Sequence, residues 1–172
     1  MIVLLGYMGS GKSRVGKALA EQMKIPFLDL DAYIEAEENR SIPAIFNAVG
    51  ELGFRKLEWS YLQQLVAQKE NQVLALGGGT PCYSNVMGFL KSQPQIRTVF
   101  LKTQLATLAE RLWSERRHRP MIAHIESQEA LVEFIGKHLF ERNPFYEQAL
   151  YRVDTSAKSV STIVAELETL LG

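Results

Sequence analysis

The 172-residue sequence contains one cysteine, Cys82, so no disulfide can form within the chain. This scarcity fits a reducing compartment, and a chain of this length buries enough apolar surface to fold without covalent cross-links. The sequence also lacks any apolar run long enough to span a bilayer, and no signal peptide stands before its first apolar segment. We therefore expect a cytoplasmic protein with no membrane partner.

An excess of either charge is missing as well. Lys and Arg total 19, Asp and Glu also total 19, and the formal net charge is zero. A neutral chain has no global field that would attract a nucleic acid, so we expect no such partner. Any anion must be recognised by local basic residues. Internal repeats and interdomain linkers are also absent, and the length predicts a single domain over residues 1–172.

Histidine and cysteine are too sparse to indicate a metal cluster. His118, His124 and His138 have no metal-site spacing with cysteines or carboxylates, so we interpret them as surface or lid residues. Cys82 has no base beside it in the sequence, and we interpret it as an inert small residue.

The sequence does contain a complete phosphate-binding motif. Residues Gly6–Ser13 read Gly-Tyr-Met-Gly-Ser-Gly-Lys-Ser and follow the apolar run Ile2–Leu5 directly. A loop between a buried strand and a helix directs backbone N–H groups and the helix dipole at one point, where an anion is favoured. Lys12 is expected to reach the β- and γ-phosphates, and the Ser13 hydroxyl to ligate Mg²⁺. The sequence therefore predicts that the chain binds a nucleoside triphosphate.

The phosphate loop leaves the reaction open, because kinases, GTPases and motor ATPases share it. The Asn-Lys-x-Asp stretch with which GTPases usually read guanine is absent. The phosphoryl acceptor must therefore be inferred from residues elsewhere in the chain.

Strand and helix patterns alternate along the whole chain. Short apolar segments predict strands at Ile2–Leu5, Phe27–Leu30, Val73–Leu76, Thr98–Leu101 and Tyr151–Val153. Helical patterns occupy Arg14–Met23, Ser41 to near Gly50, Glu51–Val66, Asn85–Lys91, Gln104–Trp113, Gln128–Phe140 and Ser159–Leu171. This order predicts a three-layer α/β/α domain around a five-stranded parallel sheet, with ligands at the carboxyl ends of the strands.

Two segments do not fit simple crossovers. The stretch 31–66 is too long for one connection, and we expect an inserted helical subdomain there. The stretch 114–128 is polar and predicts a mobile loop, for which a lid is a common role.

Several residues at the predicted strand ends are candidates for chemistry. Asp29 and Asp31 stand two residues apart, so on a strand both carboxylates would point to one side, although acidic residues at this position also cap helices. The triplet Gly77–Gly79 exposes backbone N–H groups and leaves room for a ligand, although it also suits a flexible turn.

Three arginines are candidates for binding anions. A guanidinium grips a carboxylate with two hydrogen bonds or neutralises a transferring phosphoryl group. Arg55, Arg119 and Arg142 stand in segments that suit such roles, but each one alone is more typical of a protein surface.

Taken in order, these motifs resemble those of the shikimate kinase family over essentially the whole chain. The matching segments are Gly6–Ser13, Phe27–Asp31, Ser41–Ile42, Ile45–Phe46, Gly50–Glu51, Phe54–Arg55 with Glu58, Leu76–Gly79, Arg119–Pro120, and Arg142 with Pro144–Tyr146. The resemblance implies a P-loop kinase fold, a helical substrate-binding insertion at 31–66 and a lid at 114–128. It also implies transfer of the ATP γ-phosphoryl group to the 3-hydroxyl of shikimate, in aromatic amino-acid biosynthesis, by a monomer that uses Mg²⁺.

The same resemblance implies a role for each site residue. The implied catalytic residues are Lys12, Asp31 and Arg119. The implied ATP-binding residues are Gly9, Ser10, Gly11, Lys12, Ser13, Arg14 and Arg119. The implied shikimate-binding residues are Asp31, Arg55, Gly77, Gly78, Gly79 and Arg142, with Phe46 and Phe54 as apolar walls. Ser13 and, through water, Asp29 are implied as the Mg²⁺ site.

Some points stay open at this stage. Arg111 and the loop Thr155–Lys158 are candidates for contact with adenine. The lid reads Arg119-Pro120-Met121-Ile122, where the family commonly has two leucines after the proline. A gluconate kinase would share the phosphate loop and the lid but should lack the paired arginines Arg55 and Arg142. A non-catalytic nucleotide-binding domain would be expected to have lost Lys12, Asp31 or Arg119, or to carry a fused partner domain.

Overall fold

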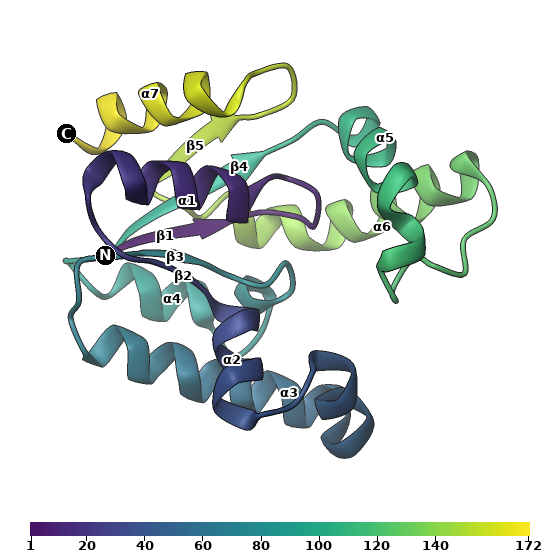
Figure 1. Ribbon diagram of the computed structural model, residues 1–172, viewed down its shortest axis with the longest axis horizontal. Coiled ribbons are helices and arrows are strands. Elements are labelled where there is room, and N and C mark those ends of the chain that lie inside the picture. Colours follow the sequence, from purple (N-terminus) through teal and green to yellow (C-terminus); the bar gives the residue numbers. More distant parts are fainter.

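The computed structural model describes residues 1–172 and contains a five-stranded parallel sheet with helices on both faces (Figure 1). The strand order is β2-β3-β1-β4-β5, and every neighbouring pair is parallel. The strands are β1 (Ile2–Leu5), β2 (Phe27–Asp29), β3 (Val73–Ala75), β4 (Arg97–Lys102) and β5 (Tyr151–Asp154). The helices are α1 (Lys12–Met23), α2 (Leu30–Glu38), α3 (Ile42–Ala67), α4 (Val86–Lys91), α5 (Leu105–Glu115), α6 (Gln128–Tyr146) and α7 (Val160–Leu171), with short 3-10 turns at η1 (Thr80–Cys82) and η2 (Arg116–His118). The predicted three-layer α/β/α fold is confirmed.

The central strand β1 explains why the strand segments are apolar throughout. All four of its residues are buried. Val3 and Leu5 belong to the core beneath α3 to α6, whereas Ile2 and Leu4 belong to the core beneath α1 and α7. Because successive side chains point to opposite faces, a strand covered on both sides needs apolar residues at every position. The phosphate loop therefore leaves from a central strand that is buried along its whole length.

The end of β2 differs from the sequence prediction. The strand stops at Asp29, and α2 begins at Leu30. Asp29 is the N-cap of α2, because its Oδ1 accepts hydrogen bonds from the backbone N–H groups of Asp31 at 3.1 Å and Ala32 at 3.5 Å. The prediction that Asp29 and Asp31 share one side of a strand is therefore wrong, since Asp31 lies in the first turn of a helix. The cap satisfies the free N–H groups of that turn and so favours helix at this point.

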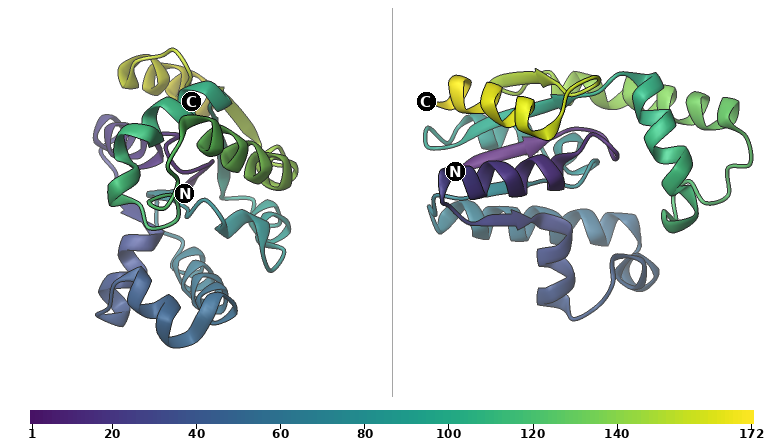
Figure 2. Two further views of the ribbon diagram at one scale, coloured as in Figure 1. Left: turned by 90° about the vertical axis from the view of Figure 1, so that its right-hand side faces the viewer. Right: turned by 45° about the horizontal axis from the view of Figure 1, so that its top comes forward.

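The segment between β2 and β3 is helical and folds as two helices with a break in the second. Ser41 is the predicted N-cap of α3, and its side chain accepts from the N–H of Ala44. Gly50 has φ 68° and ψ 179°, outside the helical region, so it separates the two halves of α3 where the sequence predicted an end. Figure 2 shows α2 and the first part of α3 on one side of the molecule and α5 and α6 on the other.

Helix α6 is longer than predicted. It continues past Phe140 and through Pro144 to Tyr146, so that Arg142 lies within a helix. Tyr146 is fully buried, and its ring centroid lies 5.2 Å from that of Phe100 on β4. Packing of this last turn against the sheet thus outweighs the missing N–H of the proline.

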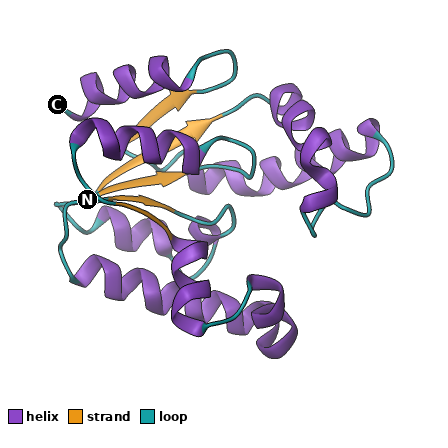
Figure 3. Ribbon diagram, viewed as in Figure 1, coloured by secondary structure: helices purple, strands orange, loops and turns teal.

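The segment 114–128 contains the end of α5, the turn η2 and a stretch without regular structure (Figure 3). Most of it is polar, but Ile122 and Ile125 are buried in the larger core. The polar composition of this segment therefore did not reveal that two side chains of the predicted lid, Ile122 and Ile125, are buried in the core. None of the helices combines the length with the apolar composition that a bilayer crossing requires.

Candidate active site

The phosphate loop connects β1 to α1 and has the backbone geometry that its glycines predict. Gly6, Gly9 and Gly11 have φ of 147°, 80° and 93°, a region that side chains disfavour. Lys12 lies over the loop, and its Nζ donates to the carbonyl oxygens of Gly6 at 2.8 Å and Tyr7 at 3.0 Å. Burial lowers the pKa of Lys12 to about 8, while Asp31 and Asp29 act to raise it.

A cleft of about 690 Å³ opens above this loop. It brings together the loop residues Gly9–Arg14 with Asp29, Asp31, Gly77, Gly78 and Arg119. The candidate adenine contacts Arg111, Thr155 and Lys158 also line it, and so do Glu115 and residues 159–161, which the sequence analysis did not single out. The cleft is thus lined by residues from distant parts of the chain.

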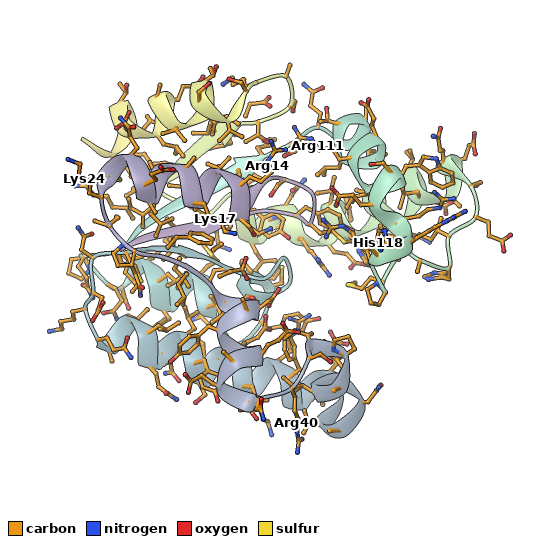
Figure 4. The ribbon with its side chains drawn as sticks, viewed as in Figure 1. Arg14, Lys17, Lys24, Arg40, Arg111 and His118 are labelled. Carbon is orange, nitrogen blue, oxygen red and sulfur yellow. The ribbon has the colours of Figure 1, made fainter.

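One end of the cleft carries the candidate nucleotide contacts. Arg111 on α5 donates to the carbonyl oxygens of Gly9 and Thr155, both at 3.1 Å, and so links the phosphate loop to the connection after β5. Arg14 and Arg111, labelled in Figure 4, both line the cleft. Two guanidinium groups beside a phosphate loop suit a polyanionic ligand.

Ser13 and Asp29 form the candidate metal site. The Ser13 hydroxyl donates to Oδ2 of Asp29 at 2.8 Å, while Oδ1 of the same carboxylate is held by the N-cap hydrogen bonds of α2. No group of three or more histidine, cysteine or carboxylate side chains is arranged to hold a metal ion. One hydroxyl and one carboxylate are oxygen donors that fit Mg²⁺ when the phosphates of a nucleotide supply further ligands.

Asp31 lies in a strongly perturbed environment beside a second carboxylate. Burial, then the charges of Glu58 and Asp29, raise its pKa to about 6, against the opposing effect of Lys12 and Arg55. A Cβ on Gly77 would lie 3.0 Å from Oδ1 of Asp31 and 3.0 Å from Oε1 of Glu58. Glycine at this position therefore leaves room for the carboxylates of Asp31 and Glu58 to approach each other at the end of β3.

Arg55 is held by carboxylates and by an aromatic ring. Its Nη1 donates to Oε2 of the buried Glu58 at 2.5 Å, and its Nη2 lies 3.5 Å from Oε1 of Glu51. The guanidinium carbon is 4.4 Å from the centroid of the Tyr83 ring. A Cβ on Gly79 would lie 2.6 Å from Nη2, so glycine is needed for this close approach.

Glu58 is a site residue to which the sequence analysis assigned no role. It is 2% exposed, and its other oxygen accepts a hydrogen bond from Thr80 at 2.6 Å. The signal that was available is the spacing of three between Arg55 and Glu58 on one helix, which places opposite charges side by side.

The predicted apolar walls, Phe46 and Phe54, contact each other with ring centroids 4.4 Å apart. Phe54 is buried and Phe46 is half-buried. Neither lines the cleft, and Arg55, Gly79 and Arg142 also lie outside its lining, although Arg55 is packed against Gly79. The two aromatic rings thus pack together, and the guanidinium carbon of Arg55 lies 5.5 Å from the centroid of the Phe54 ring.

Arg142 on α6 differs from Arg55 because it forms no ion pair within the protein. Its Nη1 lies 3.6 Å from the position of a Cβ on Gly78, and its guanidinium carbon lies 5.5 Å from the centroid of the Tyr7 ring. One turn further along α6, the Tyr146 hydroxyl donates to the carbonyl of Gly78 at 2.5 Å.

Two of the remaining predictions are resolved by burial. His138 is half-buried, and its Nδ1 lies 2.9 Å from the Tyr7 hydroxyl, so its interpretation as a surface or lid residue is wrong. Its partner is 131 residues away in the chain, beyond the reach of a local pattern. His118 and His124 are exposed.

Burial raises the pKa of Cys82 to about 11, which keeps the thiol protonated at neutral pH.

Arg119 lines the cleft together with its ion-pair partner. Its Nε and Nη2 both donate to Oε2 of Glu115, at 2.9 and 2.5 Å. Both side chains are more than a third exposed, so the pair contributes little to stability and is free to separate.

A phosphate loop on a five-stranded parallel sheet, with Asp31, Arg55 and Arg142 grouped at the glycine triplet beside it, is the arrangement of a P-loop kinase of small molecules. A family model described as shikimate kinase matches residues 8–171. The chain is 42% identical over 170 residues to the shikimate kinase of Flavobacterium johnsoniae, which covers 99% of this chain and 98% of the relative. It belongs to the shikimate kinase family.

Solved structures agree with this placement. The crystal structure of shikimate kinase from Bacteroides thetaiotaomicron has a TM-score of 0.90 at 37% identity, with 99% of this chain and 97% of the other covered. Shikimate kinase from Acinetobacter baumannii, solved in complex with shikimate, has a TM-score of 0.84 at 33% identity, covering 99% and 91%. A gluconokinase from Sinorhizobium meliloti, at 21% identity and a TM-score of 0.51, shares the fold alone.

Proposed function

We propose that this chain transfers the γ-phosphoryl group of ATP to the 3-hydroxyl of shikimate, releasing ADP and shikimate 3-phosphate. The observation that carries the proposal is the grouping of Asp31, Arg55 and Arg142 around the glycine triplet at the end of β3, beside the phosphate loop. Shikimate offers a carboxylate for the arginines and hydroxyls for the aspartate. The relative from Acinetobacter baumannii, solved with shikimate, supports the same acceptor.

Arg55 and Arg142 bind the acceptor carboxylate in this proposal. The rigid support of Arg55 by Glu58 fixes one guanidinium, while Arg142 brings a charge that no protein carboxylate neutralises. The backbone of Gly77, Gly78 and Gly79 approaches the ring of the acceptor. Phe46 and Phe54 support this end of the pocket from the helical insertion at 31–66.

Asp31 orients the acceptor hydroxyl and takes its proton as the oxygen attacks the γ-phosphorus. A carboxyl group with a pKa of about 6 is ionised at neutral pH and is a better proton acceptor than an ordinary aspartate. Most of the rate enhancement in phosphoryl transfer comes from positioning and charge stabilisation, so orientation by Asp31 matters as much as its basicity.

The phosphate loop residues Gly9, Ser10, Gly11, Lys12, Ser13 and Arg14 bind the phosphates of ATP. Lys12 moves from the carbonyls of Gly6 and Tyr7 to the β- and γ-phosphates. Ser13 and, through water, Asp29 hold Mg²⁺, which supplies charge neutralisation at the phosphates when bound. Arg111 and the loop 155–158 contact the adenosine portion.

Arg119 stabilises charge on the transferring group after the lid at 114–128 closes. To do so it must leave Glu115, to which it is bound in the present conformation. The buried side chains of Ile122 and Ile125 anchor the second half of the lid, so the closing motion is centred on η2 and Arg119.

We further propose that the enzyme acts as a cytoplasmic monomer without nucleic-acid or membrane partners, which its balanced charge supports.

The test is ADP release measured with shikimate, quinate and gluconate as acceptors. We expect strong stimulation by shikimate and little by gluconate, which lacks the ring that the proposed acceptor site at Arg55 and Arg142 accommodates. Asp31→Asn protein, prepared in the same way, controls for contaminating kinases. Equal stimulation by gluconate would contradict the proposal.

A further inference from the structure

Helix α6 presents three side chains, one turn apart, toward the substrate side of the sheet. His138, Arg142 and Tyr146 follow one another at intervals of four residues, so they lie on one face of the helix. The first contacts Tyr7 in the phosphate loop, and the last donates to the carbonyl of Gly78 in the glycine triplet. Arg142 therefore lies between two hydrogen bonds that tie α6 to the two loops of the site.

Arg142 depends on these neighbours for its orientation. Arg55 is fixed by two carboxylates, whereas Arg142 has none. Its guanidinium carbon lies 5.5 Å from the centroid of the Tyr7 ring, within the range of a cation–π contact. Together with Gly78 and the Tyr146 hydroxyl, this ring supports the guanidinium group.

The Tyr7 ring is itself held by His138. Tyr7 is 1% exposed, and its hydroxyl is 2.9 Å from Nδ1 of His138. Burial raises the pKa of Tyr7 to about 12, so the hydroxyl keeps its proton and is able to donate it in a hydrogen bond. Burial and the charge of Arg142 lower the pKa of His138, against an opposing effect of Glu141, so the imidazole is neutral at pH 7, and with its proton on Nε2 it accepts the hydrogen bond at Nδ1.

We propose that the hydrogen bond between Tyr7 and His138 positions Arg142 to receive the acceptor carboxylate. His138 is then a positioning residue that acts through Tyr7, and the phosphate loop takes part in acceptor binding as well as in ATP binding. The inference rests on the proposed function, because it deepens the role given there to Arg142.

The test compares Tyr7→Phe, which removes the hydroxyl and keeps the ring, with His138→Leu, which removes the acceptor nitrogen. Each should raise KM for shikimate about three- to tenfold, the effect of one lost neutral hydrogen bond, and change KM for ATP and kcat by less than about twofold. His138→Asn, whose amide oxygen takes a place near that of Nδ1, should restore most of the affinity. Lys137→Leu is the matched control, because Lys137 is exposed on the same helix.

Two further comparisons separate positioning from general loss of structure. The double variant of Tyr7→Phe and His138→Leu should be no worse than either single variant, since both remove the same bond. In an Arg142→Ala background, His138→Leu should have no further effect on KM for shikimate. If His138→Leu does not fold, Tyr7→Phe carries the test, because it changes no packing.

The inference is overturned if both single variants leave KM for shikimate unchanged. It is also overturned if their effects add, or if the KM values for ATP and shikimate rise together while the melting temperature falls. Wild-type protein that does not turn over shikimate would overturn the proposed function and this inference with it, and that result is visible before any variant is compared.

Discussion

Replacing Glu58 with glutamine should move the acidic limb of the pH–rate profile. Oδ1 of Asp31 and Oε1 of Glu58 each lie 3.0 Å from the position that a Cβ on Gly77 would take, so these two oxygens are no more than about 6 Å apart. Among the charged groups that raise the pKa of Asp31, Glu58 has the largest effect. Glutamine removes this charge and keeps an oxygen that accepts from Thr80 or Arg55.

The size of the expected pKa shift follows from the distance between the carboxylates of Glu58 and Asp31. Two unit charges about 6 Å apart repel by roughly 3 kcal/mol at an effective dielectric constant of about 20, or about two pKa units. The guanidinium of Arg55, 2.5 Å from Glu58, offsets much of this repulsion in the wild type. We therefore expect the pKa of Asp31 to fall by about one unit in Glu58→Gln.

The sign is determined by which form of Asp31 is active. The ionised carboxylate accepts the proton, so activity is lost as the pH falls through its pKa. A lower pKa moves that loss to a lower pH. The measurement is kcat/KM for shikimate at saturating Mg·ATP between about pH 4.5 and 8. Bound phosphates shift the acidic limb to higher pH in both proteins. The quantity to compare is therefore the difference of about one pH unit between the two limbs.

Glu51→Gln is the matched control, because Glu51 also contacts Arg55, at 3.5 Å, but from an exposed position with 57% of its side chain accessible. Its acidic limb should coincide with that of the wild type. A limb for Glu58→Gln that stays in place or moves to higher pH would refute the reasoning, since either Asp31 is not the titrating group or Glu58 does not act on it.

Four further variants test the roles of individual residues. Arg55→Lys keeps the charge but loses the fork of donors, so shikimate should bind about ten- to a hundredfold more weakly in calorimetry, with ATP little changed; unchanged shikimate binding would remove Arg55 from the site. Asp31→Asn should retain Mg·ATP binding and lose turnover, whereas Asp29→Asn should raise the Mg²⁺ concentration needed for half-maximal rate; the opposite pattern would reverse the two roles. Arg119→Ala should depress kcat more than ATP affinity, and hydrogen exchange should show residues 114–128 protected only when nucleotide and shikimate bind together; equal protection in the free protein would contradict a moving lid.

The fold was predictable because its signals are local. The apolar strands, the glycines of the phosphate loop and the cap at Ser41 each act through residues within a few positions of one another. The same is true of Lys12 and Ser13, whose places follow from the motif itself. These features can therefore be recognised in the sequence as short patterns.

The misplaced features depend on contacts across the chain. His138 was taken for a surface residue because its partner Tyr7 stands at the other end of the sequence. Ile122 and Ile125 are isolated apolar residues in a polar stretch, and only tertiary packing shows that they are buried. The predicted helix ended at Phe140, whereas α6 continues through Pro144 to Tyr146, which is buried against the sheet. In each case a distant contact outweighs the local preference.

The central claim is that the γ-phosphoryl group of ATP reaches the 3-hydroxyl of shikimate. The most direct measurement is phosphorus–proton correlation NMR of the product formed from shikimate and Mg·ATP. We predict one phosphoester whose phosphorus couples to the proton on carbon 3, formed in step with ADP. A phosphorus signal coupled to another ring position, or inorganic phosphate without any phosphoester, would contradict the account.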